Sequence, residues 1–141
     1  MDSKPLGKTK YTENIVFGAV DRSVPFFPFS SDQSVVVGDG KVGFCVPANL
    51  NGKSLTGVTA SVVTQGTTGC TTQVQVRRLR GASPVDMLSG KITLTTSDFT
   101  TSTCTIDGAN DDLLTGDLVY IDVDSVTTVA PLGLSVTLTF A

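Results

Sequence analysis

The 141-residue sequence contains no histidine and no tryptophan, and its only glutamate is Glu13. Without histidine, the usual Ser-His-Asp and Cys-His nucleophile systems cannot be assembled. A structural zinc site would also have too few ligands, because the chain has only three cysteines and no histidine. The cysteines also include no Cys-x-x-Cys pair. We therefore expect no catalytic residues, no metal site and no bound cofactor.

Charge and long apolar runs are also scarce. Charged residues make up 16% of the chain and the formal net charge is −3, so we expect no basic surface able to neutralise nucleic-acid phosphates. No apolar run approaches the roughly 18 residues that cross a bilayer. The segment Met1–Lys8 has no apolar core behind its charges, so it does not predict a signal peptide. Neither nucleic acid nor membrane is an expected partner.

The sequence is rich instead in threonine and valine, with apolar residues at every second position of two segments, Leu113–Asp124 and Leu132–Phe140. A period of two predicts strands with one buried face, and we expect these two segments to pair with each other. We expect Ser135, Thr137 and Asp122 to be more exposed than their neighbours. The expected core residues are Val119, Ile121, Val123, Leu134, Val136 and Leu138.

Shorter β-type segments punctuated by Gly, Pro, Asn and Asp fill most of the remaining chain. We expect strands at residues 15–20, 33–37, 41–46, 55–63, 72–79, 91–95 and 103–106. Gly38-Asp39-Gly40 predicts a hairpin turn, because glycine tolerates positive φ. About eight or nine strands at spacings of about 8–12 residues are typical of a sandwich or jelly roll. We predict an all-β, jelly-roll-like antiparallel sandwich over residues 31–141, preceded by an extended N-terminal arm, residues 1–30.

The end of this predicted arm combines two prolines with three of the seven phenylalanines of the chain, Phe26, Phe27 and Phe29. The prolines exclude a central strand. The phenylalanines therefore either cap an open end of the sandwich or dock into a neighbouring subunit. The second alternative makes them candidate interface residues.

Positive charge is concentrated at Arg77, Arg78 and Arg80. By default we expect these side chains to be simply solvated. The alternative is an ion pair with Asp122 or Asp124, across the sheet or across a subunit boundary, which makes Arg77 and Arg78 further interface candidates. The two aspartates share one face of their strand, and such oxygens suit calcium. The spacing lacks the glycine and terminal glutamate of an EF-hand loop, so we favour a solvated acidic face.

Five short segments, in their order, carry a resemblance. They are GTTGCTTQVQVRR from Gly66, VDMLS from Val85, NDDLLTGD from Asn110, IDVD from Ile121 and GLSV from Gly133. Over about residues 48 to 140 the chain resembles a small β-sandwich domain that recurs in structural proteins of tailed bacteriophages, both capsid-associated and in tails or fibres. The resemblance implies a structural role in the virion, self-association, often as trimers, and no enzymatic residues.

We therefore expect a capsid decoration or minor capsid protein, assembled in the host cytoplasm, that self-associates on the particle and contacts the major capsid or other virion proteins. The length of chain before the recognisable sandwich suits clamping onto a shell, which favours head over tail. The alternative is a receptor- or glycan-binding module at a tail tip or fibre. Such a module uses exposed aromatics, for which Tyr11, Tyr120 and Phe99 are candidates.

The cysteines Cys45, Cys70 and Cys104 leave three alternatives open. An odd number leaves at least one thiol without an intrachain partner. Strand alternation turns Cys45 outward, and the other two lie among Thr and Gly in segments that we expect to be exposed. They are free thiols, as in a reducing cytosol, or they bridge subunits once a particle leaves the cell, or Cys70 bonds Cys104.

Overall fold

The alternating pattern near the C-terminus produces two strands that carry much of the core. In the computed structural model, which describes residues 21–141, β10 (Leu118–Val126) and β11 (Ser135–Phe140) bury every apolar residue that the alternation selects. Val119, Ile121 and Val136 are fully inaccessible to solvent. Since successive side chains of a strand point to opposite faces, one face of each strand lies against the core. The predicted core is confirmed on both strands.

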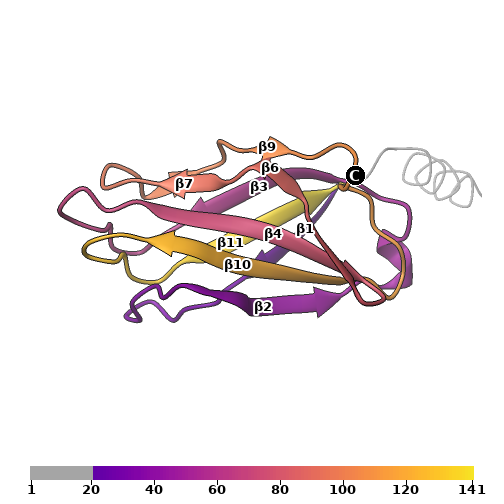
Figure 1. Cartoon of the computed structure of the whole chain (residues 1–141), viewed down its shortest axis with the longest axis horizontal. Coiled ribbons are helices and arrows are strands. Elements are labelled where there is room, and N and C mark those ends of the chain that lie inside the picture. The colour runs from indigo at the N-terminus through magenta and orange to yellow at the C-terminus, as the bar shows by residue number, and fades with distance from the viewer. Residues whose placement is uncertain (1–20) are drawn as a thin grey trace, which may run out of the picture.

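The described residues form an all-β sandwich whose strand pairs are antiparallel (Figure 1). The first sheet has the order β1–β11–β3–β8, with β1 Arg22–Phe26, β3 Leu55–Ser61 and β8 Thr100–Thr101. The second has the order β2–β10–β4–β5, with β2 Gly38–Cys45, β4 Thr72–Arg80 and β5 Ser83–Asp86. The remaining elements are β6 Leu88–Gly90 paired with β9 Thr105–Ile106, β7 Ile92–Leu94 paired with β4, and the 3-10 turn η1 Ala48–Leu50. The jelly-roll connectivity stays a prediction.

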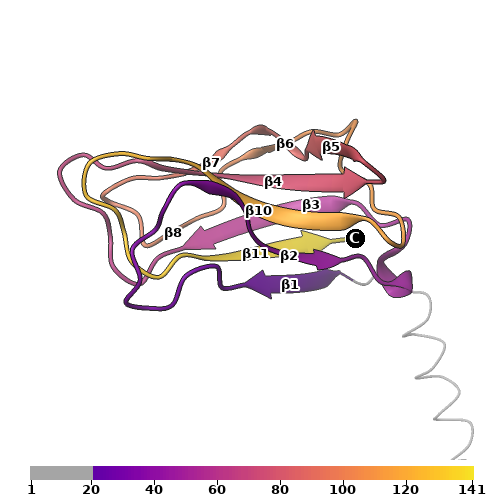
Figure 2. The same ribbon diagram turned by 60° about the horizontal axis from the view of Figure 1, so that its bottom comes forward.

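The predicted pairing of β10 with β11 is wrong. β10 lies between β2 and β4, whereas β11 lies between β1 and β3 in the other sheet. Figure 2 shows β4 and β10 in one layer and β3 and β11 in the other. Their buried faces meet in one apolar cluster, to which Ile121 and Leu138 both belong. The alternation therefore identified the inward residues correctly but not the neighbouring strand.

The predicted hairpin turn at Gly38-Asp39-Gly40 is also wrong, because these residues begin the continuous strand β2. Gly40 does have a positive φ of 62°, as its glycine identity suggested. That conformation belongs to an irregularity in the β2–β10 ladder, where the register shifts between Ile121 and Val123. The residues expected as a preceding strand, 33–37, form a bend and an isolated bridge instead.

The predicted arm is too long, because β1 begins at Arg22 and pairs with β11. β1 is an edge strand, and an edge strand accommodates Pro25, whose nitrogen cannot donate to a ladder. Phe26 and Phe29 are buried in the core of their own chain, and Phe27 is exposed. The part of the arm before residue 21, including the predicted strand 15–20, lies outside the described residues.

The two ends of the sandwich differ in what they contain. Arg22 pairs with Phe140, so the described chain enters and leaves at the same end, which we call the terminal end. The opposite end, which we call the loop end, consists of residues 27–37, 62–71, 95–99 and 127–134 (Figure 2). Backbone hydrogen bonds join these loops, such as those from the Val63 nitrogen to the Leu132 oxygen and from the Val62 nitrogen to the Phe99 oxygen.

The helix content bears on membrane insertion. In the described part of the chain, no helix is long and apolar enough to cross a membrane.

Candidate functional site

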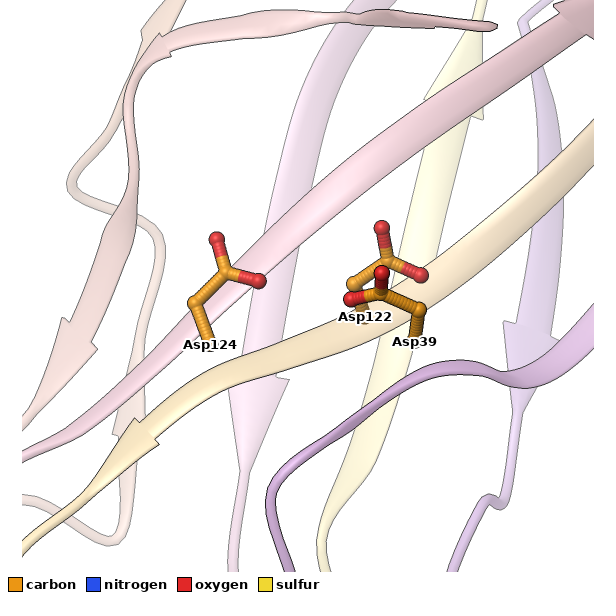
Figure 3. Close-up of side chains that lie close together, drawn as sticks. All are labelled: Asp39, Asp122 and Asp124. Atoms are coloured by element: carbon orange, nitrogen blue, oxygen red, sulfur yellow. The ribbon is translucent and has the colours of Figure 1, made fainter.

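Three aspartates lie close together on the outer face of the second sheet (Figure 3). Asp122 and Asp124 alternate with the buried valines of β10 and therefore point away from the core, and Asp39 comes from the irregular start of β2. One carboxylate oxygen from each lies within 4.8 Å of those of the other two. Oxygens at such separations suit a hard cation such as calcium, so the neighbouring charges decide what this cluster can do.

Arg77 already neutralises the innermost carboxylate, Asp122. Its Nε and Nη2 donate to the two oxygens of Asp122 at 2.8 and 3.3 Å, and the Gly40 nitrogen donates to Asp122 at 2.6 Å. Arg77 lies diagonally across from Asp122 on the β4–β10 ladder, a spacing that long side chains bridge. Its guanidinium also stacks over the Tyr120 ring, 4.9 Å from the centroid.

These contacts settle two sequence-based expectations about Asp122. Arg77 is paired with Asp122 within one chain, so the alternative of an ion pair holds for this arginine and the default of simple solvation is wrong. The expectation that Asp122 is exposed is wrong, because its side chain is only 4% accessible under Arg77. The hydrogen bond to Asp122 raises the pKa of Arg77 further, so the guanidinium stays charged.

The second cation on this face is Lys91, whose Nζ lies 2.8 Å from Asp124. The hydrogen bond that Lys91 donates to Asp124 raises the pKa of Lys91. Nearby Asp86 is partly desolvated and feels the charges of Asp124 and Asp122, and both effects raise its pKa. Two of the three clustered aspartates are thus paired with protein cations, so the arrangement is that of an ion-pair network rather than a prepared metal centre.

Arg78 and Arg80 form a separate network near the terminal end. Arg78 donates through Nη1 to the backbone oxygen and carboxylate of Asp112, at 2.6 and 2.8 Å. Arg80 pairs with Asp117 through Nε and Nη2, at 3.0 and 2.8 Å, and its Nη2 also reaches Asp112 at 3.1 Å. Arg80 therefore holds the pKa of Asp117 below its usual range. The network fixes the loop before β10 to β4.

The predicted interface residues consequently separate into two groups. Phe26, Phe29 and Arg78 are buried within the chain and are not available to a neighbouring subunit, which corrects that expectation. Phe27 is exposed, and Arg77 is partly exposed while paired with Asp122. A contact of these two residues with a partner stays a prediction.

All three cysteines are free thiols in the structure, but their environments differ. Cys45 is exposed, as the alternation predicted. Cys70 is buried, against expectation, where Gly66 packs against it and its Sγ lies 3.9 Å from the Thr72 hydroxyl. Cys104 is intermediate, and burial raises the pKa of its thiol. Cys45 is thus the thiol best placed to meet another subunit.

Exposed apolar side chains gather at the loop end. Of the seven large apolar residues that are exposed between residues 21 and 141, only Leu114 lies toward the terminal end. The six at the loop end are Phe27, Val36, Val37, Val63, Phe99 and Val129. The alternation pattern could not reveal this concentration, because each of these residues lies outside a strand.

The same end contains an open pocket of about 580 Å³ between the β3–β4 and β7–β8 loops. Val63 and Phe99 supply its apolar wall. Its polar lining consists of Thr64, Gln65, Thr67, Thr68 and Thr96. Its size falls within the range of about 300–1,000 Å³ that is usual for small-molecule sites. Among the sequence-based candidates that lie within residues 21–141, only Phe99 belongs to this pocket.

A scan against known protein families and searches of characterised proteins and of solved structures each gave no match to this chain.

Proposed function

We propose that this chain is a non-catalytic structural protein of a tailed-bacteriophage virion, a capsid decoration or minor capsid protein that self-associates on the particle surface. Residues 1–21 attach it to the major capsid or another virion protein, and the loop end points outward. The order of turn and strand segments that resembles phage β-sandwich domains supports this assignment. Trimerisation is part of the proposal and rests on that resemblance alone.

The difference between the two ends of the sandwich supports the proposed orientation, in which the loop end faces away from the particle. The described chain enters beside its C-terminus, since Arg22 pairs with Phe140. A segment preceding Arg22 therefore connects to the terminal end, and a chain held there directs the loop end away from its support. Loops carried on a rigid sheet scaffold are a common location for contacts with other molecules.

The structure shows how many N-terminal residues can be deleted to test this proposal without removing part of the sandwich. A deletion of residues 1–30 would remove β1 together with buried Phe26 and Phe29, so loss of attachment would be confused with unfolding. A deletion of residues 1–20 keeps every described contact. We expect this shorter variant to fold, with the circular dichroism and thermal midpoint of the full chain, and to be absent from purified phage particles.

The control is full-length Val36→Ala, which shortens an exposed side chain at the loop end that is not an interface candidate and keeps residues 1–20. We expect it to join particles at the wild-type level. Normal incorporation of the deletion variant would contradict attachment through the N-terminal residues. Absence of the wild-type chain from purified particles would contradict the virion assignment itself.

The alternative function, a receptor- or glycan-binding module at a tail tip or fibre, is favoured by one observation. Phe99 lies exposed on the wall of a pocket with a largely hydroxyl lining. Tyr120, the other described aromatic candidate, is stacked under Arg77 and is less available. The two functions differ in where the chain lies on a particle, on the capsid or on the tail. Both allow the loop end to point outward.

A further inference from the structure

We propose that the loop-end pocket is a binding site for a neutral saccharide, with Phe99 stacking against one face of the sugar ring and the threonine and glutamine side chains binding its hydroxyls. The proposal goes beyond the virion assignment, since it concerns what the outward end binds and holds wherever the chain is mounted. It is carried by the lining of the pocket and by the backbone of the two loops that shape it.

Among residues 21–141, the lining contains no charged side chain, although the whole sequence carries 23 charged residues, 10 basic and 13 acidic. The ligand class that it fits is therefore uncharged. The polar groups are hydroxyls and an amide, which donate and accept hydrogen bonds. Within the described part of the chain, the side chains of Thr64, Gln65, Thr67 and Thr68 have no hydrogen-bond partner. Their hydrogen-bonding capacity is free for a ligand with many hydroxyls.

Phe99 gives the pocket its apolar surface. Its side chain is 57% exposed, and the adjacent Val63 is 58% exposed. An aromatic ring has a negative face, which attracts the weakly positive C–H groups that line one face of a pyranose. A ring beside free hydroxyls thus matches a molecule with one apolar face and a polar periphery. A purely apolar ligand would leave the hydroxyls unpaired, and an ion would find no opposite charge among the described lining residues.

The loop that bears Phe99 is held in place by Asp98. One carboxylate oxygen of Asp98 accepts hydrogen bonds from both the nitrogen and the hydroxyl of Thr95, each at 2.8 Å. These bonds lower the pKa of Asp98, so the carboxylate is charged at neutral pH. The turn that presents Phe99 and Thr96 to the pocket is therefore organised before a ligand arrives, which reduces the ordering cost of binding.

The backbone of the neighbouring loops is strained at this place. In residues 21–141 only two non-glycine residues have positive φ, Thr68 at 58° and Thr128 at 50°. Positive φ is a genuine outlier for a β-branched residue, and glycine would relieve it at either position. Thr68 lines the pocket, and the Thr128 hydroxyl donates to the Thr67 oxygen at 3.1 Å. Such strain is concentrated at functional sites.

The test uses the full-length protein and saturation-transfer NMR with the methyl glycosides of glucose, galactose, mannose and N-acetylglucosamine, each at about 10 mM. Two substitutions in the pocket wall are compared, Phe99→Ala and Thr67→Val. The matched control is Phe27→Ala, a phenylalanine at the same end that is more exposed than Phe99, 72% against 57%, and does not line the pocket. Thermal unfolding of every variant verifies that the sandwich is intact.

We expect transfer to at least one neutral sugar, strongest at the C–H protons of one ring face. Phe99→Ala should weaken binding by about three- to tenfold, the usual contribution of one stacking contact, and Phe27→Ala should leave it unchanged. The proposal is overturned if none of the four sugars shows transfer, if folded Phe99→Ala binds as well as the wild type, or if Phe27→Ala weakens binding equally. Particle incorporation of Phe99→Ala is measured in parallel and should be normal, so failure of the saccharide site and failure of the virion assignment are distinguishable.

Discussion

Removing Arg77 from above Asp122 should destabilise the fold more than removing the charge of Asp122 itself. The two partners are unequally buried, with side-chain accessibilities of 23% for Arg77 and 4% for Asp122. Arg77→Met leaves a buried carboxylate whose remaining hydrogen bond comes from the Gly40 nitrogen. In Asp122→Asn, Arg77 can be hydrated by solvent, and the amide oxygen of the new asparagine can still accept the hydrogen bond from the Gly40 nitrogen.

The magnitudes follow from this difference in burial. Loss of one partner from a fully buried pair costs about 3–5 kcal/mol, and partial access of water to the Arg77 position reduces this to about 2–3 kcal/mol. Asp122→Asn should cost about 1 kcal/mol, the loss of a charge-assisted bond from a solvated arginine. The double variant, Arg77→Met with Asp122→Asn, contains no buried unpaired carboxylate at position 122, so it should be more stable than Arg77→Met alone.

The assay is urea unfolding of the four proteins at pH 7, read as the free energy of unfolding. Lys91→Met is the matched control, because it breaks a more exposed pair on the same sheet face and should cost at most about 1 kcal/mol. The reasoning is refuted if Arg77→Met costs no more than Lys91→Met. Failure of Asp122→Asn to rescue Arg77→Met would refute it equally.

Three further predictions concern other parts of the molecule. Leu138→Ala should lower the free energy of unfolding by about 2–4 kcal/mol through a cavity in the core, and a loss below about 1 kcal/mol would contradict its burial. Arg80 lowers the pKa of Asp117 in the folded state. The stability that ionised Asp117 contributes is therefore fully present above its unfolded-state pKa of about 3.9, and it is lost as pH falls through its folded-state pKa. The wild type should therefore lose stability below about pH 4, and Arg80→Met should flatten that loss in urea titrations; unchanged pH dependence would exclude this pair. Ellman's reagent should modify Cys45 in the folded protein and Cys70 only after unfolding, and rapid reaction at both would contradict the burial of Cys70.

Local alternation was sufficient to predict the fold class and the buried residues of the long strands. Val119, Ile121 and Leu138 were identified because a period of two has few other interpretations once one face must be buried. The same pattern carries no information about which strand lies beside which. Pairing of β10 with β4 and β2 joins segments far apart in the chain, and only the packed structure selects them.

The errors at individual residues have local physical causes. Asp122 occupies an outward position of its strand, but the long side chain of Arg77 covers that face. Gly40 needs its positive φ for an irregularity inside a strand, which the sequence does not distinguish from a turn. Cys70 is buried because the loop from Gly66 closes against it, although its neighbours in sequence are polar.

The loop-end pocket was beyond prediction for a different reason. Its lining comes from loops separated in sequence, and Phe99 was the only member with a recognisable property, an aromatic ring in a polar segment. Threonines are abundant throughout the chain, so those of the pocket carry no distinguishing pattern. Their free hydroxyls and the positive φ of Thr68 become visible only in three dimensions.

We propose above all that this sandwich lies on a virion surface, held at its terminal end with its loops outward. Electron cryo-microscopy of the particles that we propose carry the chain tests it most directly. We predict density for the sandwich on the outside of the capsid, with Arg22 nearest the shell and Phe99 farthest from it. Particles without such density on the capsid, or density in which the loop end faces the shell, would contradict the account.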